Sequence, residues 1–164
     1  MIDLALLDSL NLPDKRARLL ALGRAVETAA FPTVDPRMVN NHIHPTYSFS
    51  PYSPSAAVYA AREEGLATCG IVDHDSIGGA EEFIEAGKIV GIPTTIGIET
   101  RVSFGETSLH SRRTNNPDQI GCSYMVLHAV PHENIASVQA YFAPLRARRN
   151  ARNRAMIARI NDLY

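Results

Sequence analysis

The feature that most constrains the fold of this chain is an alternation of short β-prone runs with helical stretches, at intervals of about thirty residues after residue 35. The β-prone runs are residues 38–43, 67–72, 92–98 and 123–127. A strand, a helix and a further strand form the repeating unit of a parallel sheet covered by helices. The chain has 164 residues, which is enough for one such domain with its own core. The sequence therefore predicts an α/β domain built on a parallel sheet.

An apolar stripe precedes the first β-prone run. Between Leu19 and Ala29 apolar residues recur at spacings of three and four, which predicts an N-terminal helix that is opened by Pro13 and ends before Pro32. The chain thus divides into a helical segment in residues 1–34, an α/β core in residues 35–131 and a helical, arginine-rich segment in residues 132–164.

Capping residues bound the helices of the core. Ser53 and Pro54 have the residue types preferred at the N-cap and the first helical position, and Gly65 suits the left-handed position after the helix. A second helix is expected over residues 80–88, in a unit that Gly91 ends.

Two segments depart from this pattern. The polar stretch 100–121 is longer than the usual connection of about four to six residues, which indicates an active-site loop or a small insertion. Residues 132–164 have a helical composition, and a break is expected near Pro144.

Charge and cysteine content exclude several classes of protein. A net charge of −1 argues against a surface tuned as a whole to nucleic acid or to an anionic membrane. Two cysteines make no disulfide framework and suit a reducing compartment. The first thirty residues have no secretion signal, and no apolar window of about 18 residues suggests a membrane span. We therefore expect a cytoplasmic protein.

Each β-prone run ends in a side chain that can bind a metal. His42 and His44 end the first run, and His74, Glu99 and His128 follow the second, third and fourth. The carboxyl ends of parallel strands meet at one rim, so these residues would converge. A single histidine near a strand is more often a core residue, but five metal-binding types in this pattern favour a metal site. Imidazole with carboxylate suits zinc, manganese or iron without choosing among them.

Three motifs resemble the successive motifs of the PHP family, named after polymerase and histidinol phosphatase. They are Asn41-His42-Ile43-His44, Gly70-Ile71-Val72-Asp73-His74-Asp75-Ser76 and Gly97-Ile98-Glu99, and the resemblance covers about residues 40–130. It implies a distorted (β/α)7 barrel with two to three divalent metal ions (Mn, Zn or Fe) that hydrolyse phosphoric esters. It also implies five metal ligands, with Glu99 bridging two ions: His42, His44, His74, Glu99 and His128. The arginine-rich segment resembles, less distinctly, a helical insertion of the phosphoesterase branch.

The chain departs from the family pattern in three places. Residues 49–53 lack the Asp-Gly or histidine that usually follows the His-x-His pair, which leaves one metal position in doubt. No residue after His132 supplies the family's late Asp-x-His ligands, and a closed barrel takes roughly 200 residues or more. The sequence therefore predicts a barrel that is incomplete at its C-terminus, either the front of a longer protein or a reduced member.

Further side chains are candidates for catalysis and substrate binding. Asp73 and Asp75 flank His74 and either orient it or accept a proton, although Asp75 is equally suited to a helix N-cap. Arg101, two residues beyond Glu99, either binds a substrate phosphate or lies in solvent.

An arginine cluster near the C-terminus has two interpretations. Its members are Arg146, Arg148, Arg149, Arg152, Arg154 and Arg159. Such a helix either contacts an anionic substrate or nucleic-acid backbone, with Arg149 as the candidate, or exposes a solvated face. The aromatic residues Tyr47, Phe49 and Tyr52 line the pocket, stack on a base or, as is most usual, serve only in packing.

These observations lead to one expected function and two alternatives. The expected function is hydrolysis of a phosphoric ester, of a nucleotide or another small phosphorylated metabolite, by metal-bound hydroxide. The first alternative is a non-catalytic or truncated PHP-like scaffold that binds metal or nucleic acid. The second is metal-dependent hydrolysis of a C–N bond, which uses the same ligand types.

Overall fold

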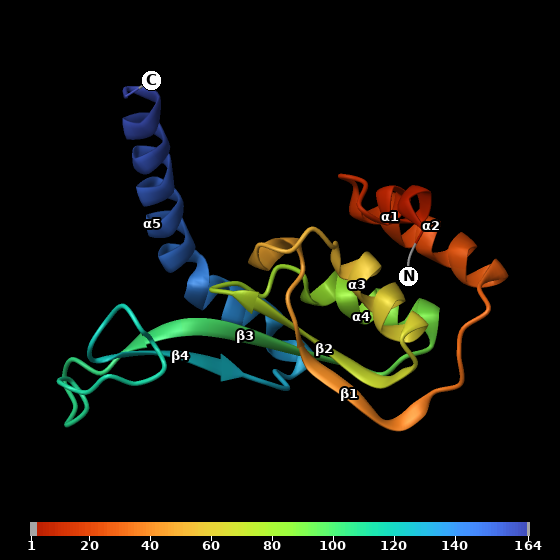
Figure 1. Ribbon diagram of the computed structural model, residues 1–164, viewed down its shortest axis with the longest axis horizontal. Helices are drawn as coiled ribbons and strands as arrows, with labels where there is room; N and C mark the ends of the chain where they lie inside the picture. The colour runs from red at the N-terminus through yellow and green to blue at the C-terminus, as the bar shows by residue number, and fades with distance from the viewer. Residues whose placement is uncertain (1–2, 164) are drawn as a thin grey trace.

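The sheet has four strands in the order β1-β2-β3-β4 in the computed structural model, which describes residues 3–163 (Figure 1). The strands are β1 (Asp35–Ile43), β2 (Leu66–His74), β3 (Thr94–Ser103) and β4 (Cys122–Leu127). β1 pairs with β2 and β2 pairs with β3 in parallel, with a helix in each crossover. The predicted parallel α/β core is confirmed for these three strands.

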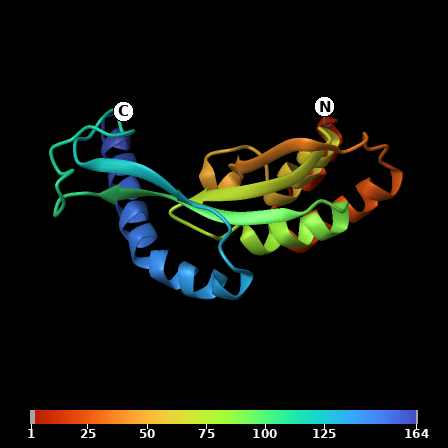
Figure 2. The same cartoon turned by 90° about the horizontal axis from the view of Figure 1, so that it is seen from below.

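The fourth strand runs opposite to the prediction. β4 is antiparallel to β3, so that Ile98 lies opposite Leu127 and Ser103 lies opposite Cys122. A parallel pair needs a crossover of a dozen or more residues, usually helical, whereas residues 104–121 hold only turns and bends. The predicted loop or insertion is thus the end of a long β-hairpin. The sheet is a curled, open arc (Figure 2), and the full (β/α)7 arrangement is not seen in residues 3–163.

The helices follow the predicted caps closely. They are α1 (Leu4–Leu10), α2 (Lys15–Thr28), α3 (Pro54–Glu63), α4 (Ala80–Val90) and α5 (Ile135–Asn161), with 3-10 turns η1 (Thr46–Ser48) and η2 (His132–Asn134). The side chain of Ser53 accepts a hydrogen bond from the backbone N–H of Ala56, which confirms the predicted N-cap. Gly65 and Gly91 follow their helices with φ of 75°, a conformation that a side chain would strain.

Two predictions about the helices were wrong in detail, and one helix was missed. The N-terminal helix begins at Lys15, because Asp14 and not Pro13 caps it, and the short helix α1 was not predicted. α5 is continuous through Pro144 rather than broken, although it changes direction along its length (Figure 2). The predicted helical segments also included residues 1, 2 and 164, which lie outside the described residues.

Helices α1 to α4 lie in two layers on one side of the sheet. α3 and α4 pack against β2 and β3, and α1 and α2 pack on α3 and α4 from outside. The core between these layers is apolar, with residues such as Phe83, Ile71 and Ile96 almost completely buried. On β4, Met125 and Leu127 are about half exposed. No helix within residues 3–163 is long and apolar enough to cross a membrane.

Candidate metal centre and its cavity

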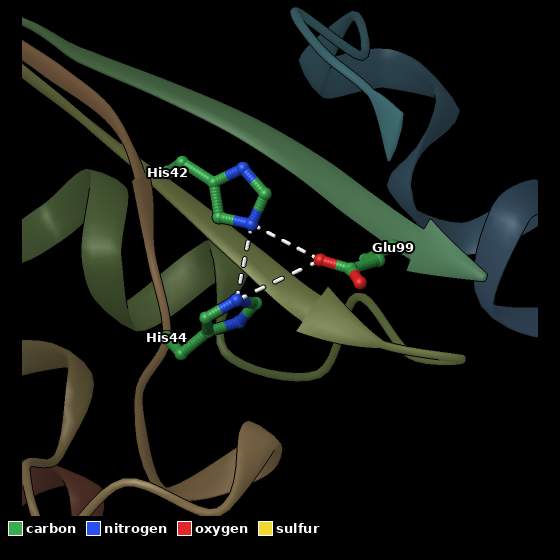
Figure 3. Close-up of side chains that lie close together, drawn as sticks. All are labelled: His42, His44 and Glu99. Carbon is green, nitrogen blue, oxygen red and sulfur yellow. Dashed lines mark hydrogen bonds and ion pairs between the residues drawn. The ribbon is translucent and has the colours of Figure 1, made fainter. Parts of the chain in front are cut away.

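Three of the predicted ligands meet at one point beside the sheet. Nε2 of His42 lies 3.0 Å from Nε2 of His44 and 3.0 Å from Oε2 of Glu99, and Nε2 of His44 lies 3.6 Å from the same oxygen (Figure 3). One ligand atom from each residue falls within 4.8 Å of the others. Two imidazoles and a carboxylate at this spacing fit a divalent transition-metal ion.

Strand geometry explains why these three residues meet. His42 lies in β1 and His44 follows two positions later, so both side chains leave the strand on the same side. Glu99 comes from β3, on the far side of β2 in the sheet order. The curl of the sheet, visible in Figure 2, brings side chains from these non-adjacent strands together.

A backbone carbonyl selects the tautomer of His44. Nδ1 of His44 lies 2.8 Å from the carbonyl oxygen of Val72, and a carbonyl can only accept a hydrogen bond. Nδ1 therefore carries the proton and donates it, which leaves the lone pair of Nε2 facing His42 and Glu99. This arrangement, in which a ligating histidine donates its other N–H to the protein, is usual at metal sites.

The two other predicted ligands flank this cluster. Nε2 of His74 lies 3.8 Å from Oε1 of Glu99, and its ring centroid is 4.6 Å from that of His44. The ring of His128 has its centroid 6.0 Å from that of His42. The structure therefore brings all five side chains to one region, with His42, His44 and Glu99 at its centre.

His128 reaches the cluster by a different route from the one predicted. Because β4 is antiparallel, its carboxyl end returns to the middle of β3 and not to a shared rim. Gly97 makes this approach possible, since a Cβ there would collide with the carbonyl oxygen of Leu127 and would lie 3.5 Å from Cα of His128. Glu99 likewise lies inside β3, four residues before Ser103, and not at its end.

The surroundings of His74 change the pKa of its imidazole. Partial burial, followed by the neighbouring His44, lowers the pKa of His74. The imidazole is therefore neutral near pH 7 and retains a nitrogen lone pair.

The two aspartates beside His74 point in different directions. The Asp73 side chain is 1% exposed, and its Oδ2 accepts a hydrogen bond from the backbone N–H of Gly79 at the start of α4. Asp73 thus faces the helix layer and not the imidazole, which corrects the expectation that it orients His74. Burial raises the pKa of Asp73 to about 7.

The Asp75 side chain points toward Thr100 and Arg149 instead. Its Oδ1 accepts a hydrogen bond from Oγ1 of Thr100 at 2.7 Å, and its Oδ2 lies 2.6 Å from Nη1 of Arg149. The N-cap of α4 is Gly79, so the alternative that Asp75 caps this helix is wrong.

A cavity of about 440 Å³ adjoins the cluster. It lies between α5, the β3–β4 hairpin and the loop after β1, and its lining comprises Phe49, His74, Asp75, Glu99, Thr100, Arg101, Tyr124, Leu145, Arg148, Arg149 and Arg152. Four guanidinium groups face two carboxylates there. The cavity therefore favours an anionic ligand.

Both arginines proposed from the sequence line this cavity. Arg101 donates to Oε1 of Gln119 and to the hydroxyl of Tyr124, each at 3.2 Å, and its guanidinium lies 5.4 Å from the Tyr124 ring centroid. Arg149 is paired with Asp75. Of the predicted aromatic residues, only Phe49 lines the cavity.

Several lining residues were not given an individual role from the sequence. Arg148 and Arg152 were named only as members of the arginine cluster, although their spacing of four residues on α5 places them on one helix face. Thr100 and Tyr124 belong to the hairpin, whose pairing had not been predicted, and nothing in the local sequence marked them.

Comparison with known proteins places this chain in a family. The PHP domain profile matches residues 40–157. The error-prone DNA polymerase of Mycobacterium tuberculosis is 35% identical over 92 residues, which make up 55% of this chain and 8% of the polymerase. The 5'-3' exoribonuclease of Haemophilus influenzae is 33% identical over 69 residues, 42% of this chain and 25% of that enzyme.

Two solved structures share the fold. A candidate metal-dependent phosphoesterase from Bifidobacterium adolescentis matches 77% of this chain and 40% of its own, with a TM-score of 0.57 and 24% identity. An amidohydrolase from Chromobacterium violaceum, with bound sulfate and no metal, matches 76% of this chain and 38% of its own, with a TM-score of 0.59 and 24% identity. The chain thus spans less than half the length of each of these relatives.

Proposed function

The chain belongs to the PHP domain family, and from this premise we propose that it is a metal-dependent hydrolase of phosphoric esters. The proposed substrate is a nucleotide or another small phosphorylated metabolite. The observation that carries the proposal is the position of the His42, His44 and Glu99 cluster beside a cavity rich in arginine. A metal ligand set next to an anion-binding wall is what hydrolysis of a phosphoric ester requires.

The metal-binding role is assigned to the clustered side chains. His42, His44 and Glu99 would hold a divalent ion, with His128 as a proposed further ligand and with His74 beside them in the cavity lining. When bound, a divalent ion at such a site polarises a phosphoryl oxygen and lowers the pKa of water toward about 7. The hydrogen bond from His44 to Val72 keeps the imidazole oriented for this role.

Substrate binding is assigned to the arginines. Arg101 and Arg149 present fixed guanidinium groups, which can donate two hydrogen bonds to one phosphate. Asp75 orients Arg149 through their ion pair. This charge balance favours a phosphoric ester over an amide, because a neutral C–N substrate would gain little from four arginines. The likeness to an exoribonuclease, an enzyme named for acting on RNA, supports a nucleotide phosphoester.

A hydrolysis assay on the metal-loaded protein tests this proposal. Phosphate release from p-nitrophenyl phosphate and from a nucleoside monophosphate should require Mn²⁺ or Zn²⁺ and should stop when EDTA removes the metal. Bound metal without turnover would favour a non-catalytic scaffold. Release of ammonia or an amine without phosphate from amide substrates would favour C–N hydrolysis.

A further inference from the structure

The cavity has two chemically different sides. One side contains Glu99, which belongs to the cluster with His42 and His44, and the other side contains the arginines of α5. His74 lies between them, 3.8 Å from Glu99 through its Nε2 and 5.6 Å from Phe49 between ring centroids. What His74 faces on the arginine side therefore decides whether a second cation can lie there.

Arg149 is held in place on that side. Its Nη1 lies 2.6 Å from Oδ2 of Asp75, whose other oxygen is bound by Thr100. The backbone of Asp75 is in the left-handed region, with φ of 52°, and its N–H donates to the carbonyl of Glu99 at 2.9 Å. This non-glycine conformation is uncommon, and these hydrogen bonds keep the carboxylate in its place.

Phe49 completes the support of Arg149. The guanidinium lies 5.5 Å from the centroid of the Phe49 ring, within range of a cation–π interaction. Phe49 is 82% exposed and has φ of 66°, an unfavourable backbone conformation for a bulky residue. Its ring is thus presented to the cavity rather than packed into the core.

This arrangement leaves only Oε1 of Glu99, among the carboxylate oxygens of the described cavity lining, to join His74 in binding a second cation. Among the cavity-lining residues that the structure describes, the carboxylates are Glu99 and Asp75, and both oxygens of Asp75 are already bound. A second ion would also lie beside the fixed positive charge of Arg149, and such like-charge contacts are unfavourable in a partly buried site.

We infer that Arg149 takes the place of a second metal ion at His74. In this inference, which rests on the proposed function, Arg149 binds the substrate phosphate through its guanidinium, and His42, His44 and Glu99 would hold the one ion that assists it. His74 then contacts the anion and not a metal, in contrast to the two to three ions implied by the family resemblance. Asp75 is a positioning residue for Arg149.

Metal counting on the full chain tests the metal half of this inference. The protein is loaded with Zn²⁺, freed of excess metal and analysed by inductively coupled plasma mass spectrometry. The ion count per chain should be the same in the wild type and in His74→Ala. A Phe49→Asp variant, which supplies a carboxylate beside His74, should gain an ion. An ion lost in His74→Ala would overturn the inference.

A phosphate-binding assay tests the second part of this inference, that Arg149 binds the substrate phosphate. Inorganic phosphate should bind the zinc-loaded protein. The Arg149→Met substitution should raise the Kd for phosphate about tenfold or more and leave the zinc count unchanged. Arg149→Lys should restore part of the affinity, because it keeps the charge without the bidentate geometry. Arg154→Met is the matched control, since Arg154 lies on the same helix outside the cavity lining. Equal affinities in Arg149→Met and the control would overturn the inference. A wild type that binds no zinc would instead overturn the proposed function.

Discussion

A hydrogen bond to one backbone carbonyl determines the tautomer and the orientation of the His44 imidazole. Val72 accepts the Nδ1 proton of His44, so the imidazole has a defined tautomer before any ligand arrives. Within residues 3–163 no backbone carbonyl binds the His42 ring in this way, and Nε2 of His42 contacts both His44 and Glu99. The pair therefore combines one pre-oriented ligand with one adaptable ligand.

Replacing this pair tests the metal centre directly. The double variant His42→Ala, His44→Ala should lose its bound metal, because only Glu99 of the central cluster remains. The fold should persist, since neither side chain is buried in the apolar core. Metal analysis and circular dichroism measure the two effects. Unchanged metal content in a folded double variant would refute the assignment.

The buried carboxyl group of Asp73 gives a prediction about pH and stability. Burial raises its pKa to about 7 in the folded protein, against about 3.9 in an unfolded chain. Between these values the folded state binds more protons than the unfolded state, so the free energy of unfolding falls as pH rises from about 4 to about 7. At 1.36 kcal/mol per pKa unit the loss is at most about 4 kcal/mol.

Urea unfolding at pH 5 and pH 7.5 checks this prediction. The wild type should lose more stability between the two pH values than Asp73→Asn, which cannot ionise and still offers an acceptor to Gly79. Equal losses in the two proteins would show that Asp73 titrates normally.

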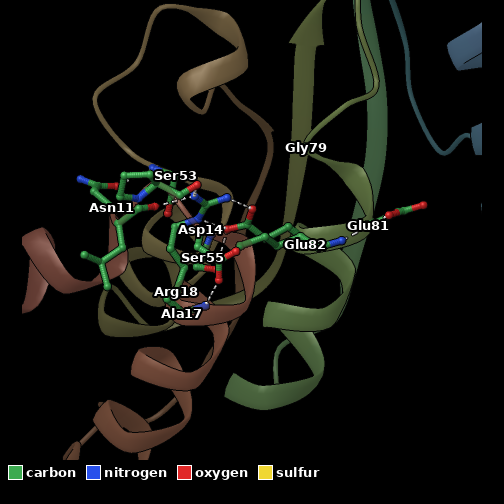
Figure 4. A network of polar contacts seen from close by, with 12 residues as sticks. Asn11, Asp14, Ala17, Arg18, Ser53, Ser55, Gly79, Glu81 and Glu82 are labelled. Atoms are coloured by element: carbon green, nitrogen blue, oxygen red, sulfur yellow. Dashed lines mark hydrogen bonds and ion pairs between the residues drawn. The ribbon is translucent and has the colours of Figure 1, made fainter.

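At the scale of elements, one buried ion pair joins the N-terminal helices to the core. Nε and Nη2 of Arg18 in α2 lie 2.8 and 2.5 Å from the two carboxylate oxygens of Glu82 in α4 (Figure 4). The hydroxyl of Ser55 in α3 donates to the same carboxylate at 2.7 Å. Three helices thus share one buried carboxylate, so the N-terminal segment is bound to the core by specific polar contacts.

Breaking the Arg18–Glu82 ion pair should lower the free energy of unfolding. Arg18→Met leaves the Glu82 carboxylate buried without its main partner, which is expected to lower the free energy of unfolding by about 3–5 kcal/mol. Lys15→Met is the control, because the Lys15–Glu81 pair between the same helices is exposed and contributes about 0–1 kcal/mol. Chemical denaturation gives both values. Similar losses in the two variants would contradict the buried role of Glu82.

At the scale of the whole molecule, the two halves of the site depend on different parts of the chain. The proposed metal ligands His42, His44 and Glu99 come from the sheet, whereas Arg148, Arg149 and Arg152 come from α5. Among the described residues of α5, the apolar side chains that pack against the core come from its first turns: Ile135, Val138 and Phe142. The outer part of α5 therefore contributes charge to the cavity and little to stability.

Removing residues 145–164 should weaken phosphate binding without affecting metal binding. The shortened protein should keep its fold and its bound metal, because the deleted residues of α5 include none that are buried in the described structure. Its phosphate affinity should fall by about tenfold or more, because the arginines of α5 are lost. Calorimetric titration with phosphate and metal analysis measure these effects. Loss of metal from a folded, shortened protein would mean that α5 supports the metal centre as well.

Local sequence determined much of this architecture. The strand–helix alternation, the Ser53 N-cap and the Gly65 and Gly91 helix ends depend on residues within a few positions, so they could be predicted directly. The His42 and His44 pair is equally local, because alternation along a strand places both imidazoles on one side.

The tertiary structure decided the rest. The antiparallel direction of β4, the approach of His128 past Gly97 and the pairing of Asp75 with Arg149, 74 residues away, arise from contacts between distant segments. Asp73 and Asp75 are alike in sequence, but one lies under α4 and the other faces the cavity. The residue types of a segment determine which hydrogen bonds it can make. Packing against remote strands and helices determines which residues it makes them with.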